Sequence, residues 1–291
     1  MVNSPQPDDW RSYFLPGSDV LRNKLGISDA TELQTAEYDV VEIQATALTE
    51  GDAPIEGDTA AERLSSIHST LFGEIYDWAG ENRVVNMAKG GQNFGDHSSM
   101  NMYLRQLNGQ INRFDWDASS FNDKVDKLAD LHTDLNFAHP FREGNGRSSR
   151  VFMSDLASRH GVDLDFGAVD KPAWNDASAA SFLDPDGLRM DYQPIRGIYQ
   201  DIATTVEPEA APAAGRDTDS PAAEVAAELQ QDVDRELADP FDVGDPFDPE
   251  TYDSAGSASS VPSYGYSNDP ANQDITTTSS LDRDADRGPE L

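Results

Sequence analysis

Apolar residues recur with helical spacing in the segment from Leu64 to Trp78. Because an α-helix has about 3.6 residues per turn, side chains three or four positions apart lie on one face. The apolar face of this segment consists of Ile67, Leu71, Ile75 and Trp78. The pattern predicts an amphipathic helix that ends near Gly80.

Two other segments show the same periodicity. One begins near Ser28 or Asp29 and continues toward Leu48. The other covers residues 122–137, and Pro140 stops it because proline disfavours a helical backbone at the residue before it. The apolar stripe of this second segment consists of Val125, Leu128, His132 and Leu135. Together the three segments predict a mostly helical domain.

A short non-helical stretch separates two of these helices. Residues 83–87 have the composition of an extended strand, and Gly90-Gly91 and Phe94-Gly95 follow them. Glycine pairs permit a tight turn and a return strand. We therefore expect a small β-hairpin here.

The composition changes after residue 203. All the tryptophans lie before this point, at Trp10, Trp78, Trp116 and Trp174, whereas Ala, Pro, Asp, Ser and Thr dominate beyond it. Such a composition buries too little apolar surface to offset the entropy of ordering. The sequence predicts a folded domain over residues 1–203 and an acidic, disordered tail over residues 204–291. Asp-Pro-Phe-Asp occurs twice in the tail, at 239–242 and 245–248, either as a docking motif or as solvated low-complexity chain.

The chain is strongly acidic, with 54 Asp and Glu against 21 Lys and Arg and a formal net charge of -33. This charge repels nucleic acid phosphates and anionic membrane surfaces, so we expect no direct nucleic acid binding and no membrane association. Cysteine is absent, which excludes disulfides and thiolate metal sites. The first ten residues contain no apolar core of a secretion signal, and no segment approaches the roughly 20 apolar residues of a membrane span. We expect a cytoplasmic protein.

Residues 139–150 concentrate the residue types that bind and transfer phosphate groups. They read His-Pro-Phe-Arg-Glu-Gly-Asn-Gly-Arg-Ser-Ser-Arg. Gly144 and Gly146 let the backbone turn with its N–H groups facing one concavity, which favours an anion. A helix that opens near Gly146 would add the unpaired N–H groups of its first turn to this site.

The side chains of this segment supply the remaining chemistry. Arg147 and Arg150 stand three positions apart on the expected helix and can bind phosphate oxygens. Glu143 offers the oxygen ligand that Mg2+ prefers, and the amide of Asn145 can donate to a phosphoryl oxygen. His139 can take a proton from a hydroxyl near neutral pH. The segment has no obvious resident nucleophile, so direct attack by an incoming hydroxyl is the simpler scheme.

A packing interpretation of the same segment is that the glycines form a helix cap and a turn and the arginines form a solvated helix face. Each feature alone has that explanation, but a base, an acid, two glycines, an amide and two arginines within twelve residues favour a phosphate site. The other histidines, His68, His97, His132 and His160, lack the spacing of zinc ligands, and we interpret them as structural or incidental.

The segment 139–150 resembles the signature of Fic proteins, H-P-F-x-[D/E]-G-N-G-R-x-x-R, and matches every specified position. Residues 17–27 and 75–81 also look like recurrent segments of bacterial Fic domains. The resemblance covers roughly residues 10–203. It implies an all-α Fic fold, a helical bundle in which a central helix pair holds the signature loop, with a β-hairpin flap over the active site.

The resemblance also implies an activity and a role for each signature residue. His139 would be the catalytic base, Glu143 would hold Mg2+, and Phe141 would anchor the loop. The nucleotide-binding residues would be Gly144, Asn145, Gly146, Arg147 and Arg150. The implied reaction is protein adenylylation, in which AMP passes from Mg-ATP to a Tyr, Ser or Thr hydroxyl of a target protein. Relatives that transfer other nucleotides or phosphocholine keep the signature, so the donor remains open.

In the family, the flap aligns an extended target segment by strand addition, and an apolar flap side chain clamps the acceptor residue. Lys89, Gly90 and Phe94 resemble this flap, with Phe94 as the candidate clamp. The alternative is that Phe94 only packs the hairpin onto the domain.

Fic enzymes are often inhibited by a glutamate within [S/T]-x-x-x-E-[G/N], which pairs with the second signature arginine. Residues 46–51 fit these letters and make Glu50 a candidate inhibitory residue. Because such a loose motif often matches by chance, we favour a separate antitoxin-like protein as the inhibitor and a toxin of a toxin-antitoxin pair as the setting. The competing hypothesis is a degenerate nucleotide-binding module that acts through its acidic tail.

Overall fold

The computed structural model describes residues 10–182 and 190–206, and this part of the chain is predominantly helical, as predicted. The α-helices are α1 (Ala30–Thr49), α2 (Ala60–Phe72), α3 (Met100–Arg113), α4 (Phe121–Ala138), α5 (Asn145–Ser158), α6 (Lys171–Ala180) and α7 (Gln193–Ile202). Three short 3-10 helices are η1 (Trp10–Tyr13), η2 (His97–Ser99) and η3 (Phe166–Ala168). The strands are β1 (Ala88–Lys89), β2 (Gln92–Asn93), β3 (Val162–Leu164) and β4 (Ala203–Thr205).

Polar side chains determine where α1 and α4 begin. The carboxylate of Asp29 accepts from the backbone N–H of Glu32 at the start of α1. Ser120 and Asp123 form a reciprocal capping box at the start of α4. Such caps satisfy N–H groups that have no partner within the helix. The predicted bounds of α1 and α4 are therefore confirmed.

The prediction for α2 is wrong at its C-terminal end. The helix stops at Phe72, with Gly73 as its C-cap, and does not reach Gly80. Ile75 and Trp78 are nevertheless buried, because the chain after α2 turns back onto the core. Their apolar character reflected burial and not helical periodicity.

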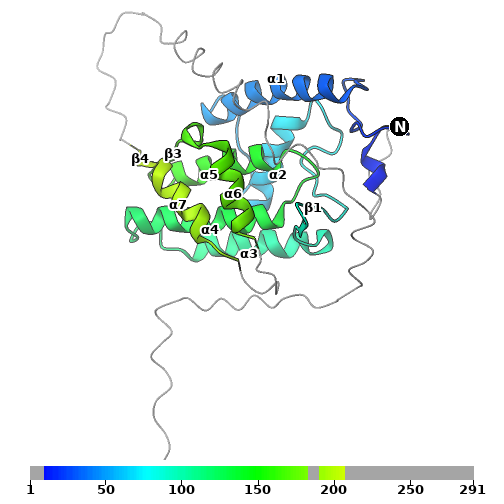
Figure 1. Cartoon of the computed structure of the whole chain (residues 1–291). Coiled ribbons are helices and arrows are strands. Elements are labelled where there is room, and N and C mark those ends of the chain that lie inside the picture. The colour runs from blue at the N-terminus through cyan, green and yellow to red at the C-terminus, as the bar shows by residue number, and fades with distance from the viewer. Residues whose placement is uncertain (1–9, 183–189, 207–291) are drawn as a thin grey trace, which may run out of the picture.

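Helix α5 lies at the centre of the domain. It packs against α1, α2 and α4, and its Met153 and Leu156 are fully buried. In Figure 1, α1 lies along one side of the molecule and α3 and α4 lie along the opposite side, with α5 between them. The segment that joins α4 to α5 is the signature loop, so the helix packing holds both of its ends.

Two strand pairs complete the fold. β1 and β2 form an antiparallel hairpin whose turn, Gly90-Gly91, has positive φ at both residues. The predicted hairpin is confirmed, although its strands occupy residues 88–93 and not residues 83–87. β3 pairs antiparallel with β4, which extends past the predicted domain boundary at residue 203. Most of the predicted tail, with both Asp-Pro-Phe-Asp copies, lies outside the described residues.

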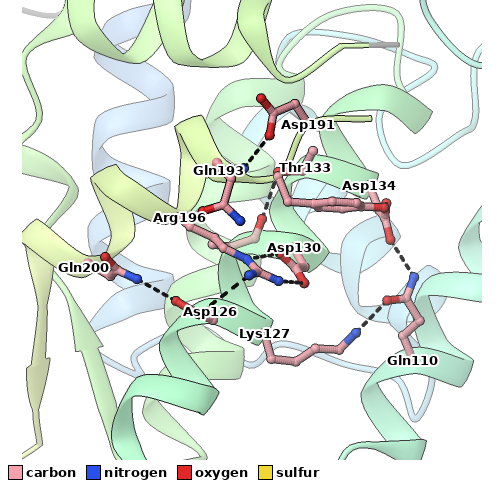
Figure 2. Close-up of polar contacts among 12 residues, drawn as sticks. Gln110, Asp126, Lys127, Asp130, Thr133, Asp134, Asp191, Gln193, Arg196 and Gln200 are labelled. Atoms are coloured by element: carbon pink, nitrogen blue, oxygen red, sulfur yellow. Dashed lines mark hydrogen bonds and ion pairs between the residues drawn. The ribbon is translucent and has the colours of Figure 1, made fainter. Parts of the chain in front are cut away.

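Helices α4 and α7 meet along a seam of charged side chains, which we call the α4–α7 seam (Figure 2). Arg196 of α7 donates to both carboxylate oxygens of Asp130, at 2.7 Å each. Gln200 donates to Asp126 at 2.8 Å. Of the helices that the structure describes, none has the length and apolar character needed to span a bilayer.

Candidate active site

The candidate base, His139, follows the last residue of α4 and has a left-handed backbone conformation (φ 47°, ψ 64°). It is the one non-glycine residue with positive φ among the described residues. Its N–H donates to the carbonyl of Leu135 at 2.9 Å, which ends the helix. This conformation costs roughly 1–3 kcal/mol and persists only where the surroundings enforce it.

The buried guanidinium of Arg83 helps to hold His139 in this conformation. Its Nε donates to the carbonyl of His139 at 2.7 Å, and its Nη2 donates to the carbonyl of Ala138 at 3.2 Å. The same group donates to Val85 at 2.6 Å and to Gly95, which flank the hairpin. Arg83 therefore connects the end of α4 to both ends of the hairpin. Sequence reasoning missed it, because the partners are backbone carbonyls that leave no sequence pattern.

The hairpin covers the imidazole of His139. Phe94, directly after β2, stacks on that ring with 3.8 Å between centroids and 16° between planes. Only 4% of His139 and 7% of Phe94 is exposed. The structure thus brings the predicted clamp onto the predicted base, while Lys89 lies in β1 and Gly90 in the exposed turn.

The loop after His139 is closed by the side chain of Asn145. Its Oδ1 accepts from the N–H of Phe141, and its Nδ2 donates to the carbonyl of Phe141, both at 2.8 Å. The predicted role of this amide was donation to a phosphoryl oxygen, but its contacts here hold the loop backbone. Gly144 has φ 75°, and a Cβ at this position would lie 2.2 Å from the ring of Phe72. Glycine is required there for both reasons.

Helix α5 begins at Asn145, close to the predicted start at Gly146. The first intrahelical bond runs from the N–H of Ser148 to the carbonyl of Gly144. The N–H groups of residues 145–147 therefore have no acceptor within the helix. A helix N-terminus of this kind binds anions through these N–H groups and the helix dipole.

The carboxylate of Glu143 lies between two arginines. Its Oε2 is 3.6 Å from Nη1 of Arg142, and its Oε1 is 3.9 Å from Nη2 of Arg147. Arg142 is itself held by aromatic rings, with its guanidinium carbon 4.1 Å from the ring centroid of Trp10. Within residues 10–182 and 190–206, no group of three or more His, Cys, Asp or Glu side chains could hold a metal ion. One carboxylate fits Mg2+ only if phosphate oxygens supply further ligands, which is the common arrangement for this ion.

Arg147 is bound by a carboxylate that sequence reasoning missed. Its Nη2 donates to Oε1 of Glu37 at 2.6 Å, and the hydroxyl of Tyr76 donates to the other carboxylate oxygen. Burial, with a further contribution from Glu37, raises the pKa of Tyr76 well above its usual value. Glu37 stands at helical spacing between the buried Leu33 and Val41 of α1. A carboxylate on that apolar stripe was the available signal.

Arg150 has different neighbours. Its guanidinium carbon is 5.9 Å from the ring centroid of Trp174 in α6. Burial, and to a smaller extent the charge of Arg150, lowers the pKa of His132 to about 3. His132 Nδ1 and the hydroxyl of Tyr199 are 2.6 Å apart. Arg147 lies toward α1 and α2, with its guanidinium carbon 4.8 Å from the ring centroid of Phe72, and Arg150 lies toward α6.

The candidate inhibitory residue, Glu50, is exposed at the C-cap of α1. The α1 carboxylate that contacts a signature arginine is Glu37, and the arginine is the first of the two, Arg147. Of these two α1 carboxylates, Glu37 is the one that pairs with a signature arginine, and the inhibitory role of Glu50 stays a prediction.

Comparison with known proteins places this geometry in context. Residues 58–157 match the model of the Fic/DOC family. The chain is 32% identical over 174 residues to Protein adenylyltransferase VbhT of Bartonella schoenbuchensis, covering 58% of this chain and 35% of VbhT. It is 29% identical over 188 residues to the Probable protein adenylyltransferase Fic of Escherichia coli, covering 63% of this chain and 90% of that protein.

A solved structure is also similar to this chain. The BepC protein of Bartonella tribocorum, a VirB-translocated effector with bound AMPPNP, superposes with a TM-score of 0.59 at 25% identity. The match covers 68% of this chain and 98% of that one. The residues that match the family model, 58–157, include the loop of residues 139–150.

Proposed function

Because the chain belongs to the Fic/DOC family, we propose that it is a protein adenylyltransferase, which moves AMP from ATP to a Tyr, Ser or Thr hydroxyl of another protein. The observation that carries this proposal is the loop between α4 and α5. It places His139 at one end and the N–H groups of residues 145–147 at the other, on helices packed against each other. A proton acceptor beside an anion site is what attack of a hydroxyl on a phosphate requires.

The reaction is a single displacement at the α-phosphorus of ATP. The target hydroxyl oxygen bonds to that phosphorus, its proton passes to the imidazole of His139, and the bond to the bridging oxygen of the β-phosphate breaks. The products are the AMP-modified target and pyrophosphate. The protein contributes by aligning the groups and by stabilising charge on the phosphate oxygens.

The other signature residues act on that charge. The N–H groups of residues 145–147, together with that of Gly144, would bind α- and β-phosphate oxygens, and the side chains of Arg147 and Arg150 would offset their charge. Glu143 would hold Mg2+, which when bound offsets phosphate charge further. For Arg147 to reach a phosphate, its ion pair with Glu37 must be shared or exchanged.

The hairpin would position the target. An extended target segment could pair with its edge, which Lys89 and Gly90 belong to, and bring the acceptor hydroxyl to His139. Since the ring of Phe94 lies on the imidazole, it must move aside and would then press on the acceptor residue. The cost of exposing these two rings would favour a bound target over the open site.

We propose that a separate, antitoxin-like protein inhibits the enzyme, and that the two form a toxin-antitoxin pair. The exposed position of Glu50 supports an external inhibitor over this residue. Replacement Glu50→Gly should leave self-labelling unchanged. A marked rise in labelling would instead make Glu50 the inhibitor.

The position of the radioactive label in ATP tests the proposed reaction. With Mg2+ and a bacterial lysate, ATP labelled at the α-phosphate should label a discrete protein, and ATP labelled at the γ-phosphate should not. His139→Ala should abolish labelling, and Arg147→Ala should reduce it strongly. Label from the γ-phosphate would indicate phosphorylation, and nucleotide binding without any label would indicate a binding module. Equal labelling by the His139→Ala variant would contradict the assigned base.

A further inference from the structure

A second histidine, His68, contacts the signature loop. His68 belongs to α2 and is fully buried. Its ring stacks on Phe141 with 3.9 Å between centroids and lies tilted against Phe72 with 4.6 Å between centroids. Sequence reasoning treated this residue as structural or incidental, because the histidines lack the spacing of zinc ligands. Its partner in the loop, Glu143, lies 75 positions later in the chain.

The partners of the two ring nitrogens determine where the proton lies. The backbone N–H of Gly80 donates to Nδ1 at 2.8 Å, so Nδ1 carries no proton. The nitrogen Nε2 lies 3.0 Å from the carbonyl oxygen of Glu143, which can only accept. Nε2 must therefore carry the hydrogen and donate it. The ring is the neutral Nε2–H tautomer.

Gly80 makes this arrangement possible by its close approach to α2. It has φ 83°, and a Cβ there would lie 2.0 Å from Oγ of Ser69. The segment after α2 thus orients the imidazole, and the imidazole orients the loop. In the same way, a hydrogen bond to one ring nitrogen of a catalytic histidine fixes the orientation of the ring and the proton on its other nitrogen.

His68 binds the carbonyl of Glu143, which directly precedes the N-cap residue of α5. The peptide plane that begins at the Glu143 carbonyl continues into Gly144, the left-handed N-cap of α5. Rotation of this plane would turn the N–H of Gly144 and move the first turn of α5. The N–H groups proposed to bind phosphate depend on both.

We propose that His68 is a positioning residue for AMP transfer, acting through the carbonyl of Glu143 on the anion-binding turn at Gly144. The inference rests on the proposed function, since it assigns a role within the same site. His68 touches no substrate. Its donor hydrogen bond, and not its bulk, is the feature that matters.

Two substitutions separate the hydrogen bond from the bulk. The side-chain nitrogen of glutamine can reach the position of Nε2, whereas the shorter amide of asparagine can replace only Nδ1. Both remove the stacked ring. We expect His68→Asn to lower kcat by about 10- to 100-fold, the scale of a displacement of about 1 Å in an active site, and His68→Gln to keep kcat within about threefold of the natural protein.

Thermal unfolding of both variants checks that they lose similar stability. His160→Asn, which removes a ring stacked on Trp116 away from the loop, serves as the matched control and should keep kcat. Equal losses of kcat in the two His68 variants would mean that only packing matters and would overturn the proposal. Unchanged kcat in both would overturn it as well.

A measurement on the unaltered protein needs neither folding of a variant nor activity. Nitrogen-15 NMR of the imidazole should show a slowly exchanging hydrogen on Nε2 of His68 and none on Nδ1. A hydrogen on Nδ1 would contradict the assigned contacts. Binding of AMPPNP, measured by calorimetry, should also weaken in His68→Asn and not in His68→Gln. If the natural protein labels no target while these results hold, the proposed reaction fails, and His68 positions the turn for nucleotide binding alone.

Discussion

The signature loop and the α4–α7 seam both use arginines and acidic side chains, but in different ways. In the seam, charged side chains pair with each other at a partly exposed surface, where Arg196 and Asp130 are 29% and 20% exposed (Figure 2). Around the loop, buried polar side chains bind backbone groups: Arg83 holds His139, Asn145 holds Phe141 and His68 holds Glu143. The seam joins two helices, whereas the loop contacts fix the path of one segment.

This difference bears on function. A partly exposed pair is screened by water and salt and contributes about 0–1 kcal/mol. A buried charge is costly unless it is bound, and removing its partner costs about 3–5 kcal/mol. A fold that keeps such groups around one loop has a strongly specified backbone there, as phosphate binding through N–H groups demands.

The largest effect should come from Arg83. Replacement by Met leaves the carbonyls of His139, Val85 and Gly95 without their buried donor. We expect a loss of about 3–5 kcal/mol in the free energy of unfolding, together with loss of transfer activity at temperatures where the variant is folded. Urea unfolding measures the first effect and labelling measures the second. Full activity in the folded variant would show that Arg83 is not needed to position the loop.

The next effect concerns Glu37. Glu37→Gln removes the carboxylate that pairs with the buried guanidinium of Arg147 and should cost about 3 kcal/mol. AMPPNP should then raise the melting temperature of the variant more than that of the natural protein, because its phosphates replace the missing negative charge. Differential scanning calorimetry with and without AMPPNP gives both values. An equal rise in the two proteins would place Arg147 away from the nucleotide.

A pH effect should follow from His132, a buried residue of α4 whose Nδ1 lies 2.6 Å from the hydroxyl of Tyr199 in α7. Its pKa of about 3 in the folded protein lies below the ordinary 6.5, so the unfolded chain binds the proton first on acidification. The contribution of His132 to stability is complete above about pH 6.5 and decreases toward pH 3, by about 2 kcal/mol at pH 5. The double variant His132→Leu/Tyr199→Phe should show a smaller decrease over this range in denaturant titrations. Parallel curves would mean that His132 titrates normally.

The smallest effect should come from the seam. Arg196→Met breaks the contacts with Asp130 and Asp126 but leaves no fully buried charge. We expect a loss of under about 1 kcal/mol, reduced further at high salt, with kcat unchanged. A loss as large as that of Arg83→Met would erase the distinction between the two regions.

The elements that could be predicted from sequence are those with local signals. Asp29 marks the start of α1, Pro140 marks the end of α4, and Gly90-Gly91 marks the hairpin turn. Residues 139–150 revealed the candidate site because its base, glycines and arginines are contiguous in the chain. The end of α2 could not be predicted, because burial extended the apolar pattern beyond the helix.

The residues that support the loop gave almost no local signal. Arg83 lies 56 positions from His139, and Glu37 lies 110 positions from Arg147. Their partners are backbone carbonyls or side chains of distant helices, and such contacts depend on how the helices pack. Sequence reasoning therefore found the groups proposed to touch substrate and missed the groups that hold them in place.

The most direct test of the central claim is a crystal structure of the protein with AMPPNP and Mg2+. The account predicts phosphates against the N–H groups of residues 145–147, Glu143 on the metal ion, and the imidazole of His139 facing the α-phosphorus. Nucleotide bound elsewhere, or an imidazole turned away from the phosphates, would contradict it.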